Sequence, residues 1–165
     1  EPMEVEKAAL ALDAALPRGI RVLAADAVDT HHAALMSQAA GASYRVTLPY
    51  SKDVSAAVAE FNAAPEVLFK KAAPKTKAKF KEIDVKFYIP QLTAEQTEKE
   101  TIFSFDCKIT PTGSMKAVDL LNALNEQYGL ALPVEMADIE RLRLYRNNKN
   151  GKPIPMLNSD AVTLG

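Results

Sequence analysis

Two stretches of the chain alternate strictly between apolar and polar residues, and each is followed by a helical pattern. The alternations cover residues 43–48 and 103–109, and the helical patterns cover residues 54–61 and 118–128. A period of two is typical of strands that bury one face and expose the other. A period near 3.6 is typical of helices that cover such a face. We therefore expect an antiparallel sheet with helices packed against one of its faces.

The order of the expected elements indicates a fold class. Apolar pairs predict further strands at residues 67–69 and 141–145, and we interpret residues 91–100 as a surface connection. Residues 42–146 then give strand, helix, strand, inserted arm, strand, helix and strand. This is the βαββαβ order of a ferredoxin-like sandwich, an α+β fold with two helices on one face of one sheet. The arm at residues 70–90 is either a strand of that sheet or an excursion from it.

The beginning of the chain forms a helix, a strand and a short helix that cannot bury their apolar residues alone. We place them at residues 5–16, 20–23 and 30–40 and expect their packing partners upstream, in a portion missing from this chain. The first residue is Glu1, so we expect a processed product or a piece of a longer polypeptide. The expected division is an incomplete upstream α/β unit over residues 1–40, a ferredoxin-like domain over residues 41–150 and a loosely held tail over residues 151–165.

The overall composition excludes several classes of protein. Twenty Lys and Arg residues against 21 Asp and Glu residues leave a net charge of −1, so no global field attracts nucleic acid or membranes. The single cysteine excludes an internal disulfide framework and fits a reducing compartment, so we expect a cytoplasmic protein. No apolar run is long enough to span a bilayer, and we expect no membrane partner.

The residue types that carry catalysis are sparse. The adjacent His31 and His32 are the only histidines, and neighbours on a helix point about 100° apart, which disfavours joint chelation. Cys107 lies on the apolar side of its strand, where cysteine is usually a small buried hydrophobe. Asp106 lies on the opposite side, where we favour a structural partner for an arginine over acid–base catalysis. We expect no catalytic residue, no metal site, no cofactor and no enzymatic activity.

The inserted arm is locally basic. Residues 70–86 contain seven lysines and two acidic residues, a local balance of +5. One interpretation is a solvated stretch that protects a sheet edge, since edge lysines suppress aggregation. The other is an arm that contacts phosphates, because lysines neutralise backbone charge without reading sequence. Under the second interpretation the RNA-contacting residues are Lys75, Lys77, Lys79 and Lys81.

The exposed face of the predicted sheet is also basic. The alternation places on it Arg45, Lys108, Arg141, Arg143 and Tyr145. An open sheet that offers cations and an aromatic ring is physically similar to the surfaces that hold single-stranded RNA. One tyrosine is a thin stacking platform, and a plain solvated surface is the alternative. We predict that Arg141, Arg143 and Tyr145 support an RNA strand.

Several short motifs resemble one bacterial family. They are ALPRGIRVL at residues 15–23, ASYRV at residues 42–46, KTK at residues 75–77, KEIDVK at residues 81–86 and IERLR at residues 139–143. These motifs resemble the bacterial radical-SAM-linked domain of unknown function. The resemblance implies an accessory module that neighbours, or is fused behind, an uncharacterised radical SAM protein. Members usually begin with a further strand–helix–strand portion and a Gly-Phe-Asn-Pro-His-Pro-like segment, which this sequence lacks.

Residues and resemblance together give three hypotheses of function. The first is a non-catalytic module that recruits RNA for a radical SAM protein, through the lysine-rich arm and the basic sheet face. The second is a protein-docking module for that partner, without nucleic-acid binding. The third is an enzyme fragment whose site needs an upstream portion. The lone Cys107 cannot supply the cysteine triplet that holds a radical SAM iron–sulfur cluster.

Overall fold

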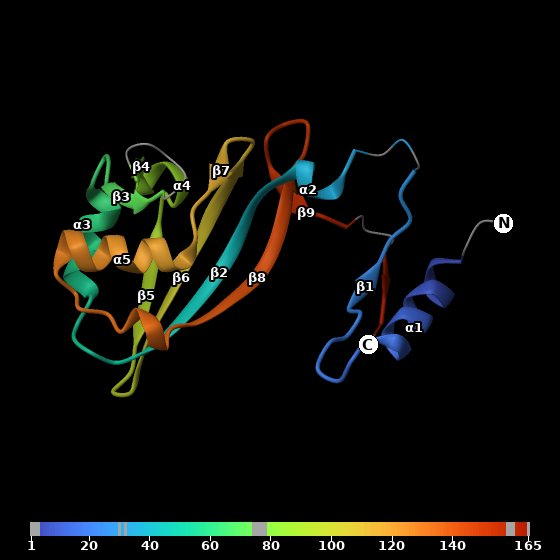
Figure 1. Cartoon of the computed structure of the whole chain (residues 1–165), viewed down its shortest axis with the longest axis horizontal. Coiled ribbons are helices and arrows are strands. Elements are labelled where there is room, and N and C mark those ends of the chain that lie inside the picture. Colours follow the sequence, from blue (N-terminus) through green and yellow to red (C-terminus); the bar gives the residue numbers. More distant parts are fainter. Residues whose placement is uncertain (1–3, 30, 32, 74–78, 158–160, 165) are drawn as a thin grey trace.

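An antiparallel sheet forms the centre of the molecule (Figure 1). The computed structural model describes residues 4–29, 31, 33–73, 79–157 and 161–164. The strands lie in the order β5, β6, β2, β8 and β9, with β7 paired to β6. Their bounds are β2 (Ala39–Pro49), β5 (Leu92–Gln96), β6 (Glu100–Thr110), β7 (Gly113–Ser114), β8 (Asp138–Asn147) and β9 (Pro153–Pro155).

Two helices cover one face of this sheet and form the core with it. They are α3 (Ser55–Ala63) and α5 (Ala117–Tyr128). Phe61 of α3 and Leu120 of α5 are fully buried in one apolar cluster with Phe103 of the sheet. The alternation in β2 and β6 predicted this correctly, because its apolar side is the side that the helices bury. The mixed α+β class is therefore confirmed.

The second expected strand does not belong to the central sheet. Residues 67–69 lead into β3 (Leu68–Ala72), which pairs with β4 (Phe80–Asp84) as a separate two-stranded sheet. Phe69 and Ile83 lie opposite each other and anchor this hairpin in the core. The lysine-rich arm is thus an excursion from the central sheet. It ends in the single helical turn α4 (Val85–Tyr88).

The interpretation of residues 91–100 as a surface connection is wrong, because β5 occupies this segment and forms an edge of the central sheet. Its outward side chains, Thr93 and Glu95, are exposed, so the segment has the polar composition of a loop. Asn62 of α3 continues the pairing on one outer side of β5. Its side-chain amide donates to the Leu92 carbonyl at 2.7 Å and its oxygen accepts from the Leu92 N–H at 2.9 Å.

The beginning and end of the chain meet in a lobe beside the sheet (Figure 1). This N-terminal lobe contains α1 (Val5–Ala15), β1 (Ala24–Ala25) and β10 (Val162–Thr163), with β1 antiparallel to β10. Asp13 joins helix to strand by accepting from the Arg21 Nε at 2.9 Å and the Val22 N–H at 2.8 Å. Residues 151–165, which we expect from the sequence to form a loosely held tail, supply both β9 and β10.

Two short elements complete the description. The single turn α2 (Leu35–Gln38) lies within the expected helix at residues 30–40, and the 3₁₀ turn η1 (Val134–Met136) precedes β8. Within the described residues, no helix is both long and apolar enough to cross a membrane.

Candidate functional site

The sheet face opposite α3 and α5 presents three rows of paired residues, which we call the helix-free face. Residues directly opposite each other in antiparallel strands point to the same side. The rows across β6, β2 and β8 are Lys108–Gly41–Tyr145, Asp106–Ser43–Arg143 and Ser104–Arg45–Glu140. The face therefore combines cations with carboxylates and hydroxyls, and it includes Asp106, which the alternation predicts on this side as a structural partner for an arginine.

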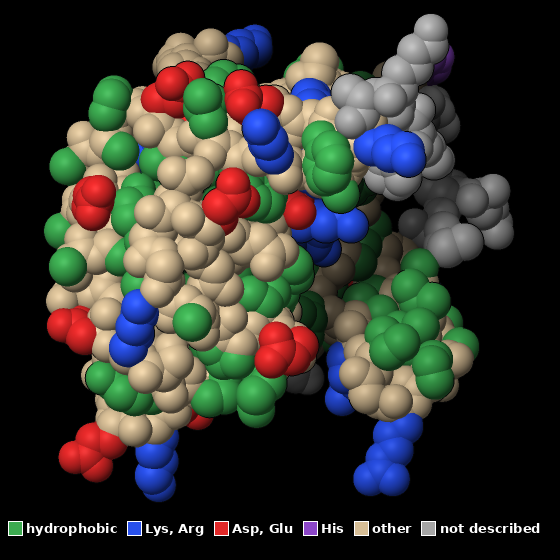
Figure 2. Space-filling model, turned by 60° about the vertical axis from the view of Figure 1, so that its left-hand side comes forward, with side chains coloured by type: hydrophobic (Ala, Val, Ile, Leu, Met, Phe, Trp, Pro, Cys, Tyr) green, Lys and Arg blue, Asp and Glu red, His purple; other side chains and the backbone are tan. Residues whose placement is uncertain are grey.

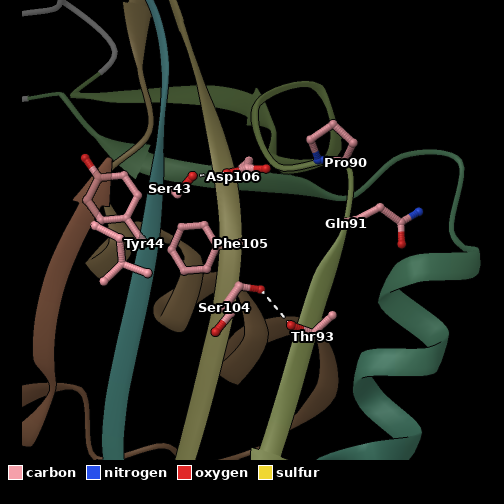
Figure 3. Close-up of a pocket in the computed structure, with 9 residues that line it drawn as sticks. Ser43, Tyr44, Pro90, Gln91, Thr93, Ser104, Phe105 and Asp106 are labelled. Carbon is pink, nitrogen blue, oxygen red and sulfur yellow. Dashed lines mark hydrogen bonds between the residues drawn. The ribbon is translucent and has the colours of Figure 1, made fainter. Parts of the chain in front are cut away.

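Two open hollows meet at the middle row. Both are lined by Ser43 and Asp106, whose side chains point toward each other between β2 and β6 (Figure 3). The Ser43 hydroxyl donates a hydrogen bond to the Asp106 carboxylate. This bond leaves the other carboxylate oxygen of Asp106 able to accept from a ligand.

The first hollow has a volume of about 450 Å³ and extends toward β5. Gln91, Thr93 and Ser104 contribute polar groups to it, and the Thr93 hydroxyl donates to the Ser104 carbonyl at 3.2 Å (Figure 3). Tyr44 and Phe105 also border it, but their rings stack at a centroid distance of 5.6 Å and pack with the core cluster. The hollow thus offers mainly hydrogen-bonding groups.

The second hollow has a volume of about 400 Å³ and extends toward β9. Arg143 and Tyr145 line it together with the apolar Ile154 and the two prolines that flank it. A few converging polar groups against an apolar wall are typical of a binding site for a small or planar group.

Tyr145 lies against Gly41, and this contact shapes the second hollow. A Cβ atom at position 41 would overlap the Tyr145 hydroxyl and come within 2.8 Å of its ring carbon Cε2. Burial, together with the nearby Asp106 and Cys107, raises the pKa of the Tyr145 phenol. The phenol therefore stays protonated at neutral pH and can donate a hydrogen bond.

The cations of the helix-free face differ in the interactions that they form with neighbouring side chains. Arg45 forms an ion pair with Glu140 at 3.7 Å, and the Lys108 ammonium lies 5.5 Å from the centre of the Phe87 ring. Among the described residues, no acidic side chain forms an ion pair with Arg143. Arg143 is therefore the cation of this face best placed to receive an anionic ligand.

Arg141 does not share this face, which corrects the predicted set. The pairing of β2 with β8 shifts between Ser43 and Tyr44, so that Leu142 is an extra residue in β8. Arg141 consequently lies opposite Tyr44 and out of the row that contains Arg143. A bulge of this kind breaks the alternation on which the prediction depended.

The β3–β4 hairpin carries the predicted lysines. Lys79 and Lys81 are exposed, whereas Lys75 and Lys77 lie outside the described residues. Lys71 is engaged with Asp119 of α5 at 2.6 Å. The structure thus leaves two described lysines of the predicted set open to solvent.

The remaining candidates for chemistry are weak. Cys107 is buried as predicted, its thiol donates to the Met115 carbonyl at 3.4 Å, and burial raises its pKa. The exposed His31 has its ring Nδ1 3.2 Å from the Asp29 carboxylate, and His32 is outside the described residues. No group of three or more His, Cys, Asp or Glu side chains in the described part of the chain is arranged to hold a metal ion.

Comparison with known proteins gives one match. A family described as "Uncharacterized protein conserved in bacteria (DUF2344)" matches residues 1–121, from the N-terminal lobe into α5. No curated protein and no solved structure matches the chain. The match spans most of the chain, and its description mentions no substrate, cofactor or partner. The chain therefore belongs to DUF2344, a family of uncharacterized proteins conserved in bacteria.

Proposed function

We propose that this chain is a non-catalytic accessory module that recruits single-stranded RNA for a radical SAM partner in the cytoplasm. The observation that carries the proposal is the helix-free face, where Arg143 and Tyr145 line one hollow beside the Ser43–Asp106 pair. Single-stranded RNA is held by sheets of this kind, through planar side chains that stack on bases and polar groups that bond base edges.

Three side chains of the second hollow have complementary tasks in this proposal. The Arg143 guanidinium can stack on a base or bind a phosphate, and the Tyr145 ring offers a further planar surface. The Asp106 carboxylate can accept from the amino group of a base. A phosphate is bound best by a cation that is not already in an ion pair, and Arg45 is paired with Glu140 whereas no ion pair is formed by Arg143 within the described residues.

The β3–β4 hairpin supplies the part of the RNA affinity that does not depend on the RNA sequence. Lys79 and Lys81 are exposed and, with Lys75 and Lys77, are the proposed phosphate contacts. Charge neutralisation of this kind makes the affinity fall steeply with salt.

We also infer that the core is ferredoxin-like. The strands β2, β5, β6 and β8 follow one another along the chain, and they lie in the sheet in the order second, third, first, fourth. Helix α3 follows β2, and α5 lies between β6 and β8, as in a βαββαβ unit with the hairpin inserted after α3. The radical SAM partner is proposed from the resemblance of the sequence motifs.

The test is RNA binding by two matched charge reversals. Fluorescence anisotropy with a short single-stranded RNA should show that Arg143→Glu weakens binding about tenfold or more, because an anion replaces the cation that contacts the RNA. Arg18→Glu, at an exposed position of the N-terminal lobe, makes the same charge change and should weaken binding less than twofold. Equal effects of the two variants would contradict the assignment of the helix-free face.

A second candidate function is docking to a protein, and the N-terminal lobe favours it. The exposed fraction is 77% for Leu23, 55% for Leu12 and 53% for Leu10. Figure 2 shows hydrophobic side chains gathered on this lobe, at the lower right, while acidic and basic side chains are interspersed over the rest of the visible face. Contiguous exposed apolar surface commonly marks an interaction site.

Docking is tested with the co-expressed radical SAM protein. Leu12→Ser with Leu23→Ser should abolish co-purification, whereas Arg143→Glu should not affect it. Retention of the partner by the double serine variant would contradict docking through this lobe.

A further inference from the structure

A third, smaller pocket lies outside the helix-free face, between the β3–β4 hairpin and the turn that joins β6 to β7. Its volume is about 200 Å³. The polar side chains that line it are Lys71 and Lys81 from the hairpin, Tyr88 from α4, and Thr112 and Ser114 from the turn. The hairpin with the adjoining α4, and the distant β6–β7 turn, therefore contribute two lysines and three hydroxyl-bearing residues to the lining of one small space.

The two lysines of the pocket, Lys71 and Lys81, are close enough for their like charges to repel, so a negative charge nearby would stabilise them. Lys71 and Lys81 lie directly opposite each other in the β3–β4 ladder, so their side chains leave the hairpin on the same side. Like charges directly opposite in a ladder are destabilising. Asp119 compensates one of them through its 2.6 Å ion pair with Lys71. Within the described residues, no acidic side chain forms an ion pair with Lys81, so the pocket keeps one positive charge.

The turn side of the pocket is pre-formed. Gly113 has a φ of 141°, which a residue with a side chain rarely adopts, and this conformation closes the turn between Thr112 and Ser114. The Thr110 hydroxyl donates to the Gly113 carbonyl at 2.8 Å and lies 3.1 Å from the Thr112 hydroxyl. Thr112 and Ser114 therefore line the pocket from a turn whose backbone conformation is fixed.

We infer that this pocket binds a phosphate group. A phosphate has several acceptor oxygens and no carbon surface to bury, which suits a small space with ammonium and hydroxyl donors. The Lys81 ammonium is the main contact, the Ser114 and Thr112 hydroxyls donate from the turn, and Lys71 contributes through a donor that Asp119 does not use. The phosphate is either part of an RNA backbone or part of a free phosphorylated molecule.

The site rests on the proposed function at Lys81, already one of its phosphate contacts, and adds a defined pocket for the phosphate away from the hollow of Arg143 and Tyr145. It also distinguishes the lysines of the hairpin from one another. Lys70 lies next to Lys71 in β3, so its side chain leaves the hairpin on the opposite side, where Glu82 is its ladder partner. Lys81 should therefore bind phosphate, and Lys70 should not.

The experiment is an amide NMR titration of the whole chain with sodium phosphate, against sodium chloride at the same ionic strength. Phosphate should cause saturable shifts at residues 71–73, 81–83 and 112–114, and chloride should not. Lys81→Gln should weaken phosphate binding about tenfold, the loss of one charge-assisted hydrogen bond. Ser114→Ala should weaken it less, and the matched control Lys70→Gln should leave it within twofold.

Three results would overturn the site. They are shifts that do not saturate, equal shifts with chloride, and equal weakening by Lys81→Gln and Lys70→Gln.

A final addition of short single-stranded RNA distinguishes the two sources of phosphate once the site is upheld. Displacement of bound phosphate identifies the RNA backbone as the ligand, whereas retained phosphate identifies a free phosphorylated molecule. RNA binding that is insensitive to Lys81→Gln would overturn this pocket as an RNA subsite and remove Lys81 from the proposed phosphate contacts, whereas the helix-free face is tested separately by Arg143→Glu.

Discussion

Gly41 and Tyr145 form the closest contact on the helix-free face, and it sets the shape of the second hollow. No side chain can be added at position 41 while the tyrosine ring keeps its place. The glycine is therefore required by close approach and not by an unusual backbone conformation. The sequence shows a glycine before an alternating strand, and it does not show which ring covers it.

The first prediction concerns this contact. Gly41→Ala should lower the free energy of unfolding by about 1–3 kcal/mol, the usual cost of overpacking. In a Tyr145→Ala background the same substitution should cost much less, because the overlapping ring is gone. Urea unfolding of the four chains of this double-mutant cycle measures the difference. Equal costs in the two backgrounds would show that the ring does not lie on Gly41.

The second prediction concerns the ionisation of Tyr145. Its folded-state pKa is raised above the value near 10 of an unfolded chain, so the protonated phenol stabilises the fold below that pH. This stability is lost as the pH rises through the folded-state pKa. Between pH 9 and about 11.5, the free energy of unfolding should fall more steeply for the unmodified chain than for Tyr145→Phe. Tyr128, whose pKa burial also raises, is common to both proteins. Parallel pH profiles would contradict the environment described for Tyr145.

At the scale of elements, the edge strand β5 depends on one side chain of α3. Asn62 satisfies both backbone groups of the buried Leu92. Asn62→Ala should therefore lower the free energy of unfolding by about 1–3 kcal/mol, because two buried polar groups lose their partner. Asn122→Ala, at an exposed position of α5, should change it by less than about 0.5 kcal/mol. Urea unfolding is the measurement, and similar losses for both variants would exclude a special role for Asn62.

The sequence predicts some elements well for a physical reason. Strands β2 and β6 have one buried and one exposed side, so their alternation is a direct record of their position in the sheet. Strand β5 lies at an edge and is mostly polar, and that composition is shared with loops. The extra residue Leu142 in β8 leaves no local signal, since a bulge is defined by the partner strand. Arg141 was misplaced for this reason.

The candidate site could be predicted from the sequence only in part, again because contacts between distant segments leave no local signal. The alternation correctly placed Arg45, Lys108, Arg143 and Tyr145 on one face. The hollows, the Ser43–Asp106 pair and the pocket between the hairpin and the β6–β7 turn all join segments distant in sequence. A single sequence carries no signal for such contacts.

At the scale of the whole molecule, the N-terminal lobe is packed less tightly than the central sheet and its helices. Helix α1 buries only Ala9, whereas α5 buries five residues. The N-terminal lobe should therefore open at a much lower free energy than the central sheet and its helices. Native-state hydrogen exchange should show faster exchange, by about 100-fold or more, for the amides of α1 than for those of α5. Equal protection would indicate that the lobe and the sheet unfold as one unit.

The central claim is that the chain binds single-stranded RNA through phosphate contacts and the helix-free face. The most direct test is fluorescence anisotropy with a short single-stranded RNA over a series of salt concentrations. We predict binding at low salt that falls steeply as salt increases. Reversal of Lys79 and Lys81 to Glu should weaken it and reduce the slope of log K against log salt by about 1.4, two phosphate contacts at 0.7 each. Absence of binding at the lowest salt, or an unchanged slope in the variant, would contradict the claim.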